Sequence, residues 1–183
     1  MRKLKVTEMN RLTVDEFKSS EKMPLTVVLD DVRSMYNVGS VLRSCDAFRV
    51  EAVWLCGITA VPPHPEIHKT ALGAEDSVEW RYFASALDAV RELQGRGVRV
   101  MAVEQCEGSM MLDRFEPEGG QGYAVVLGNE VKGVRQDVVD ACDGCLEIPQ
   151  FGTKHSLNVS VTAGIVVWHF AQAYIKASER QSV

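Results

Sequence analysis

Residues 25–43, LTVVLDDVRSMYNVGSVLR, decide the fold of this protein. The segment opens on a β-branched apolar run, Leu25 to Leu29, which predicts a buried strand that ends at Asp30 and Asp31. The pattern then changes, and residues 36–48 predict a helix. A short apolar strand that leads through a polar loop into a helix is the building unit of a parallel α/β sheet.

The same alternation continues along the chain. Further strands are predicted over residues 52–55, 80–83, 98–103, 123–127 and 146–148, and further helices over residues 85–93, 137–141 and 156–176. Pro62, Pro63 and Pro65 predict a loop. We therefore expect an α/β domain with a mostly parallel sheet flanked by helices, in which ligands bind beyond the carboxyl ends of the strands.

The chain has 183 residues, which suggests one domain with a short appendage. Thr13 and Glu16 have the spacing of a helix capping box, so residues 1–22 predict an N-terminal helical arm and residues 23–183 the main domain. The basic N-terminus has no apolar stretch behind it, and no apolar run reaches the ~18 residues of a membrane span. Cytoplasmic residence is the expectation.

The net charge of −5 and the pI of 5.4 disfavour a surface that binds phosphates over its whole extent. The charge is unevenly spread, however. Basic residues lie in or near the motifs described below, at Arg33, Arg43, Arg49, Lys69, Lys132, Arg135 and Lys154. A local basic patch on an acidic protein is therefore compatible with the sequence.

The cysteines and histidines predict no metal or redox site. Five scattered cysteines favour free thiols in a reducing compartment. Cys142 and Cys145 form a Cys-x-x-Cys without a second pair, and we interpret them as small apolar residues between a helix and a strand. His64 and His68 are four residues apart, but the neighbouring prolines and the lack of a third ligand argue against a metal.

Three segments at strand ends are unusual for a plain scaffold. In the first, Asn37 lies at a helix start, and Gly39 and Arg43 share one helix face, where glycine lets another backbone approach. A capped helix with a surface arginine is the simpler interpretation of this pattern. The second and third segments are residues 125–133, VVLGNEVKG, and residues 148–160, IPQFGTKHSLNVS.

The second segment is a buried strand that ends in a loop with a glycine at each end, which suits a ligand that contacts main-chain groups. In the third segment Ser156 is a candidate N-cap, and Asn158, a weak helix former, falls in the first turn. A tight turn and a polar helix start explain the same residues without any function.

Taken together, the three segments resemble the SpoU (TrmH-type) branch of the SPOUT methyltransferases. The family's Asn-x-Gly-x-x-x-Arg is matched by Asn37, Gly39 and Arg43, and its strand ending in Gly-x-Glu by residues 127–130. Its Ile-Pro, glycine-containing loop and Ser-Leu-Asn-Val-Ser are matched by residues 148–160. The resemblance covers residues 25–173 and leaves out the arm.

The resemblance implies a C-terminal deep trefoil knot, a homodimer, no metal, and S-adenosylmethionine as the cofactor. It implies methyl transfer to a ribose 2′-hydroxyl of tRNA or rRNA, with a slight preference for tRNA because a compact dimer offers a groove. The implied cofactor contacts are largely main-chain and fall on Val103, Glu104, Leu127, Gly128, Ile148, Ser156 and Leu157.

The resemblance also implies the catalytic residues. Arg43 is the expected base or activator, and Asn37, Glu130, Ser156 and Asn158 are expected to orient Arg43 and the ribose. A guanidinium is a poor base, so stabilisation of alkoxide charge and a grip on the adjacent phosphate are the alternative roles of Arg43. Two rival functions stay open: a non-catalytic RNA-binding or assembly protein, and an unrelated nucleotide-binding protein.

Overall fold

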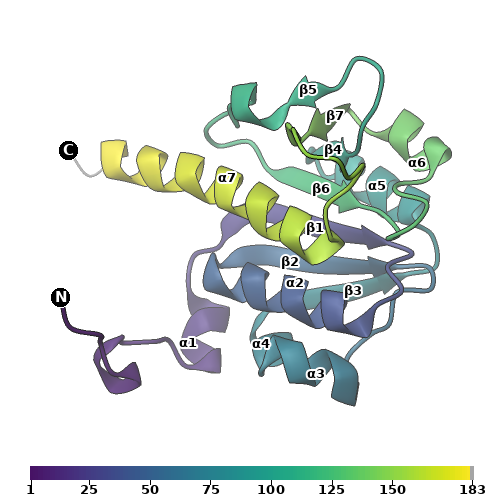
Figure 1. Ribbon diagram of the computed structural model, residues 1–183. Coiled ribbons are helices and arrows are strands. Elements are labelled where there is room, and N and C mark those ends of the chain that lie inside the picture. The colour runs from purple at the N-terminus through teal and green to yellow at the C-terminus, as the bar shows by residue number, and fades with distance from the viewer. Residues whose placement is uncertain (182–183) are drawn as a thin grey trace.

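Seven parallel strands form the centre of the protein in a computed structural model that describes residues 1–181 (Figure 1). They are β1 (Met23–Asp30), β2 (Val50–Cys56), β3 (Glu79–Phe83), β4 (Arg99–Val103), β5 (Met110–Met111), β6 (Tyr123–Leu127) and β7 (Gly144–Glu147). Their order across the sheet is β3-β2-β1-β6-β4-β7-β5. Each neighbouring pair runs parallel, which confirms the predicted fold class.

Helices cover both faces of this sheet. They are α1 (Val14–Ser19), α2 (Met35–Ala47), α3 (Pro65–Ala71), α4 (Ala74–Ser77), α5 (Ala86–Gly95), α6 (Gln136–Ala141) and α7 (Val159–Gln181), with 3-10 turns η1 (Val6–Glu8) and η2 (Leu112–Arg114). Within the described residues no helix combines the length and apolar composition that a membrane span needs.

Two hydrophobic clusters correspond to the two faces of the sheet. Because successive side chains of a strand point to opposite faces, Val27 and Leu29 of β1 pack under α2 and α7, whereas Val28 packs under α5. All three side chains are fully buried. Burial on both faces is why the parallel strands are continuous apolar runs rather than alternating ones.

The loop predicted at Pro62, Pro63 and Pro65 ends earlier than expected. The prediction is wrong for Pro65, where α3 begins. Proline at the first helical position loses no hydrogen bond, since that N–H has no partner inside the helix. His64 caps this helix, and its Nδ1 accepts from the N–H of Glu66 at 3.2 Å. A proline that was interpreted as a helix breaker is therefore a helix start.

Gly39 allows α3 to pack directly against α2. A Cβ at Gly39 would lie 2.3 Å from the carbonyl oxygen of Ile67 and 2.2 Å from Oγ1 of Thr70. Thr70 Oγ1 donates to the carbonyl of Tyr36 at 3.0 Å, which ties the two helices together. The expectation that this glycine lets another backbone approach is confirmed.

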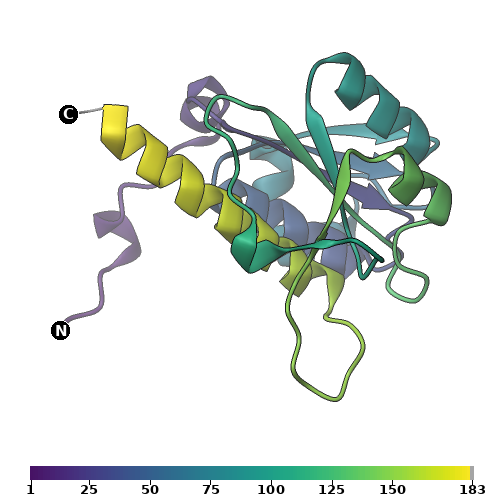
Figure 2. The same cartoon turned by 90° about the horizontal axis from the view of Figure 1, so that it is seen from above.

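The last helix starts later than predicted. Helix α7 begins at Val159, so Ser156 is not its N-cap and Asn158 lies before the first turn. Oδ1 of Asn158 accepts from the N–H of Ser160 at 2.9 Å, as a capping side chain does. Seen from above, the loops after β6 and β7 project from the same side of the sheet (Figure 2).

The N-terminal arm holds α1, whose predicted capping box between Thr13 and Glu16 is present. Phe17 of α1 is buried in the main core, while the first residues run away from the sheet (Figure 1). The division into residues 1–22 and residues 23–183 stays a prediction. So does the trefoil knot.

Substitution of Gly39 tests the contact between α2 and α3. Gly39→Ala is expected to lower the free energy of unfolding by about 1–3 kcal/mol, because the new methyl group meets α3 backbone that must shift. Urea unfolding measures this change. Gly95→Ala at the end of α5 is the control, because a Cβ there meets nothing within 4 Å. Equal stability of the two variants would contradict the packing argument.

Candidate functional site

The main candidate site is a pocket of about 580 Å³ at the carboxyl ends of β4, β6 and β7. It is lined by residues 103–105, 127–134, 147, 148, 150, 155–159 and 162. These residues come from the three strand-end loops and the start of α7, so the pocket lies where a parallel sheet gathers its loops.

The loop after β6 is held by its own main chain. Asn129 and Gly133 exchange two backbone hydrogen bonds, of 3.1 and 2.9 Å. A Cβ at Gly128 would lie 2.1 Å from the carbonyl carbon of Gly133, so only glycine lets the two ends of the loop touch. Asn129 Oδ1 also accepts from the N–H groups of Val131 and Lys132. The loop is therefore a rigid wall of the pocket.

Glu104, which follows β4, fixes this wall from the other side. Its carboxylate accepts from the N–H of Val134 at 3.1 Å and from the N–H of Gln105 at 2.9 Å. Oε2 of Glu104 lies only 2.1 Å from the position that a Cβ of residue 133 would take. Gly133 also has a φ of +67°. Close approach and positive φ both require glycine at this position.

One hydrogen-bonded chain joins the three sequence motifs. Glu130 accepts from the backbone N–H groups of Arg33 and Ser34 and from Nδ2 of Asn37, each at 3.0 Å. Oδ1 of Asn37 in turn accepts from Nδ2 of Asn158 at 3.1 Å. We call Glu130, Asn37 and Asn158 the hub, because they connect the start of α2, the loop after β6 and the start of α7.

The hub keeps Glu130 ionised. Its partial burial opposes ionisation, but the N–H groups of Arg33 and Ser34, its own N–H and the Asn37 amide outweigh burial and lower its pKa below the ordinary 4.5. The carboxylate is also near the N-terminus of α2, where negative charge is favoured. Glu130 is therefore a hydrogen-bond acceptor at neutral pH.

Arg43 lies apart from the hub, in a second hollow of about 450 Å³ between α2 and α3. The hollow is lined by Ser40, Arg43, Ser44, Ala47, Phe48, Lys69 and Thr70. Arg43 is exposed and forms no hydrogen bond or ion pair with the hub residues. The structure thus gathers four of the five predicted catalytic residues at the pocket or hub, and places the fifth on the far turns of α2.

All seven predicted cofactor-binding residues line the main pocket: Val103, Glu104, Leu127, Gly128, Ile148, Ser156 and Leu157. Glu130, Ser156 and Asn158 of the predicted catalytic set line it too, and Asn37 reaches it through the hub. Their roles remain predictions. The pocket therefore gathers residues that are spread along the chain from Val103 to Asn158, and the distant Asn37 is tied to it by hydrogen bonds.

Three further residues, which the sequence did not mark as site residues, help to build the pocket. Asn129 fixes the β6 loop, and its signal was an Asx residue after a glycine at a strand end, a typical turn former. Gln105 donates to the carbonyl of His155 at 3.0 Å and holds the loop after β7. Glu147 adds a carboxylate to the pocket wall. No local pattern marks the last two, because their partners are far away in the sequence.

The pocket suits a ligand that has a cationic part and an apolar part. Glu104 and Glu147 supply negative charge, while Leu127, Ile148 and Leu157 supply apolar walls. A cation gains from nearby carboxylates in a partly desolvated site, and apolar groups gain by leaving water.

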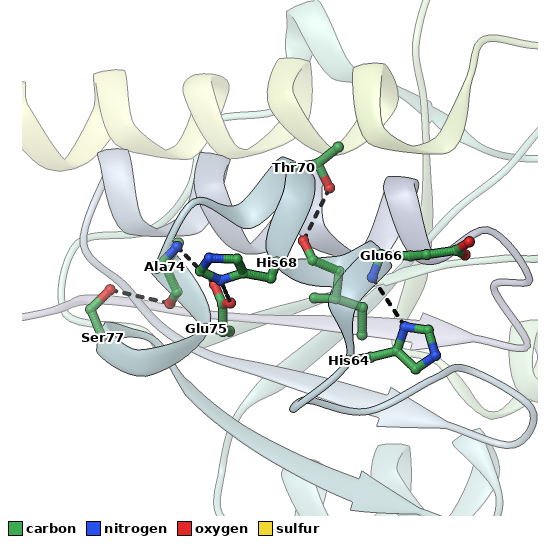
Figure 3. Close-up of polar contacts among 9 residues, drawn as sticks. His64, Glu66, His68, Thr70, Ala74, Glu75 and Ser77 are labelled. Carbon is green, nitrogen blue, oxygen red and sulfur yellow. Dashed lines mark hydrogen bonds and ion pairs between the residues drawn. The ribbon is translucent and has the colours of Figure 1, made fainter.

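The Cys-x-x-Cys pair and the His64–His68 pair do not come together as one site in the described chain. Burial raises the pKa of Cys142 and of Cys145 to about 12 each, so both are protonated thiols. His64 and His68 face different partners, with His68 against Glu75 at 2.6 Å (Figure 3). Within residues 1–181 no three metal-binding side chains lie together.

Comparison with known proteins gives consistent results. Residues 24–168 match the model of the SpoU rRNA Methylase family. The chain is 29% identical to the 23S rRNA (guanosine-2'-O-)-methyltransferase RlmB of Vibrio vulnificus, over 88% of this chain and 64% of that protein. It therefore spans less than two thirds of that relative's length.

Two further matches differ in coverage. The tRNA (guanosine(18)-2'-O)-methyltransferase of Thermus thermophilus is 31% identical, over 93% of this chain and 86% of that one. The structure of the SpoU methyltransferase AviRb from Streptomyces viridochromogenes in complex with AdoMet superposes with a TM-score of 0.74 at 22% identity, over 87% of this chain and 64% of that one. At that identity the superposition establishes the fold alone.

The hub predicts an acid-sensitive contribution to stability. Glu130→Gln is expected to lower the free energy of unfolding by about 1 kcal/mol at neutral pH, a discounted figure because solvent screens this exposed carboxylate. Since the folded pKa of Glu130 is lowered, its contribution is complete above the ordinary 4.5 and is lost as the pH falls through the folded value.

Urea unfolding of both proteins at a series of pH values measures this difference. The gap between wild type and Glu130→Gln should shrink below pH 4.5. A gap that stays constant with pH would refute the ionised hub. Glu118→Gln is the control, because Glu118 is exposed and pairs only with Arg99 at the surface.

Proposed function

Because the chain belongs to the SpoU rRNA methylase family, we propose that it transfers a methyl group from S-adenosylmethionine to a ribose 2′-hydroxyl of tRNA or rRNA. The observation that carries this proposal is the hub, which brings the three motifs to one pocket. The names of the relatives, 2'-O-methyltransferases of rRNA and tRNA, support it.

The pocket fits S-adenosylmethionine by the chemistry of its lining. When bound, this cofactor supplies an electrophilic methyl group on a positively charged sulfur. Leu127, Ile148 and Leu157 offer apolar walls, and the carboxylates of Glu104 and Glu147 favour a cation. Gly128 and Gly133 let the β6 loop close on itself and on Glu104, which fixes its main chain along one wall of the pocket.

Arg43 and Lys69 are proposed to hold the RNA backbone. Their side chains line one hollow, and two neighbouring cations suit a phosphate. A guanidinium donates hydrogen bonds and does not readily accept a proton. Because its hollow is separate from the main pocket of the same chain, Arg43 is proposed to act on the ribose held at the pocket of a second copy in a dimer. There it would stabilise negative charge on the 2′-oxygen and bind the adjacent phosphate.

The hub residues are proposed to position the ribose. Asn37 and Asn158 are locked to each other and to Glu130, so their side chains keep one orientation without substrate. Ser156 lies exposed in the pocket lining, where its hydroxyl is available to a ribose. Preorganised groups of this kind lower the cost of bringing the acceptor oxygen in line with the methyl group.

A homodimer is proposed from one face of α7. Val161, Ile165 and Trp168 are 51%, 37% and 45% exposed on this helix, and a Cβ at Gly164 would meet nothing. Large apolar side chains at helical spacing on a solvent-facing helix are typical of an interface. RNA modification by such a dimer is proposed to take place in the cytoplasm.

Substitution of Arg43 tests the reaction. Arg43→Ala is expected to reduce methyl transfer into RNA at least about 100-fold, because the charge that develops on the 2′-oxygen loses its counter-charge. The assay uses tritiated S-adenosylmethionine and total RNA that lacks its native modifications, followed by digestion to nucleosides. Label in a 2′-O-methyl nucleoside identifies the product, and separate tRNA and rRNA fractions identify the substrate.

The controls separate the rival functions. Arg43→Lys keeps the charge, and calorimetry of S-adenosylmethionine binding reports the other pocket, which neither variant should change. Wild type that binds the cofactor but labels no RNA would favour the non-catalytic RNA-binding alternative. A wild-type protein that neither binds the cofactor nor labels RNA would contradict the proposed function.

Substitution of Trp168 tests the dimer. Trp168→Glu is expected to shift the protein from dimer to monomer mass in light scattering, since a buried charge at an apolar interface is costly. Ile58→Glu, which alters an exposed side chain in the loop after β2, serves as the comparison and should leave the mass unchanged. A monomeric wild type, or a dimeric Trp168→Glu, would exclude this interface.

A further inference from the structure

The rim of the main pocket combines cations with exposed apolar side chains. Three segments form it: the start of α2, the loop after β6 and the loop after β7. Each segment places one cation and one apolar or aromatic side chain in solvent. These pairs are Arg33 with Tyr36, Lys132 with Val131, and Lys154 with Phe151.

The rim cations are available to a partner. Within the described residues, the side chains of Arg33, Lys132 and Lys154 take part in none of the ion pairs. The pocket interior is instead acidic, with Glu104 and Glu147 on its walls. Although the net charge is −5, the three cations outnumber the Glu130 carboxylate in these segments, so the pocket mouth attracts a polyanion.

Phe151 is the most exposed aromatic side chain of the rim. It is 97% exposed, against 45% for Tyr36. Its loop is nevertheless anchored, because Gln150 and His155 line the pocket and the carbonyl of His155 accepts from Gln105. A large aromatic ring that packs on nothing in its own chain contributes little to folding, but it has a wide surface to bury against a ligand.

We propose that Phe151 is an RNA-binding residue, on which an unpaired base next to the methylated nucleotide stacks. This inference rests on the proposed function. Proteins recognise RNA largely through unpaired bases, which stack on aromatic side chains. The neighbouring Lys154 favours a polyanionic partner over a second protein surface.

Phe151→Leu is the main test, because leucine keeps the apolar bulk and removes the aromatic face. Two assays are run: methyl transfer into unmodified total RNA, and binding of a fluorescent RNA hairpin with an unpaired loop beside a fully paired duplex. The KM for RNA should rise about tenfold, with little change in kcat. Such a change equals ~1.4 kcal/mol, which lies within the range of base–aromatic stacking.

No substitution of Phe151 is expected to change the fold or the binding of the cofactor. Phe151→Tyr and Phe151→Trp should behave as wild type, and all variants should keep the thermal stability and cofactor affinity of wild type, since Phe151 is not packed. Hairpin binding should weaken for Phe151→Leu, while duplex binding stays the same. Tyr82→Leu on β3, 53% exposed and far from the rim in the chain, is the matched control and should leave the KM for RNA and hairpin binding unchanged.

Three results would overturn the inference. The first is Phe151→Leu with wild-type KM and hairpin affinity, which leaves the proposed methyl transfer standing. The second is equal loss of hairpin and duplex binding. The third is a change of oligomeric mass in Phe151→Leu, which would make Phe151 a contact between copies. Failure of the proposed function is distinct, because wild type would then transfer no methyl group, while the hairpin assay would still report on Phe151.

Discussion

The site depends on one side-chain amide, that of Asn37. Its Nδ2 donates to Glu130 and its Oδ1 accepts from Asn158, so a single residue of α2 joins two loops that lie more than ninety positions further along the chain. An amide can do this because it donates and accepts at the same time. Glu130 completes the connection by accepting from two N–H groups at the start of α2. The hub thereby holds α2, the β6 loop and α7 in fixed relation around the pocket.

Negative and positive side chains occupy different places around this hub. Carboxylates line the pocket, where they suit a cationic cofactor. The cations lie on the rim and, as Arg43 and Lys69, in the second hollow. This separation explains how a protein of net charge −5 is compatible with the proposed RNA substrate. Local potential at a cleft, not total charge, governs the approach of a polyanion.

Close backbone contacts explain which glycines the site needs. Gly128 and Gly133 allow the β6 loop to close on itself, and Gly39 allows α3 to pack on α2. The latter contact forms the hollow, because α3 carries Lys69 and Thr70 to the face of α2 that carries Arg43. The glycine and the arginine of the first motif thus both lie against α3, a segment that belongs to none of the three motifs.

The sequence alone determined the parallel α/β fold and most strand positions, and through the family resemblance it indicated several of the residues that line the main pocket. Apolar periodicity and strand-end loops are local properties, and parallel strands bring their carboxyl ends to one edge whatever the details. Only the tertiary structure decided that α3 starts at Pro65, that Asn158 bonds to Asn37, and that Arg43 faces Lys69 and not the hub. Each of these depends on a partner distant in sequence. The local sequence determines the chemistry and the local conformation of a residue, and tertiary packing determines which distant groups it contacts.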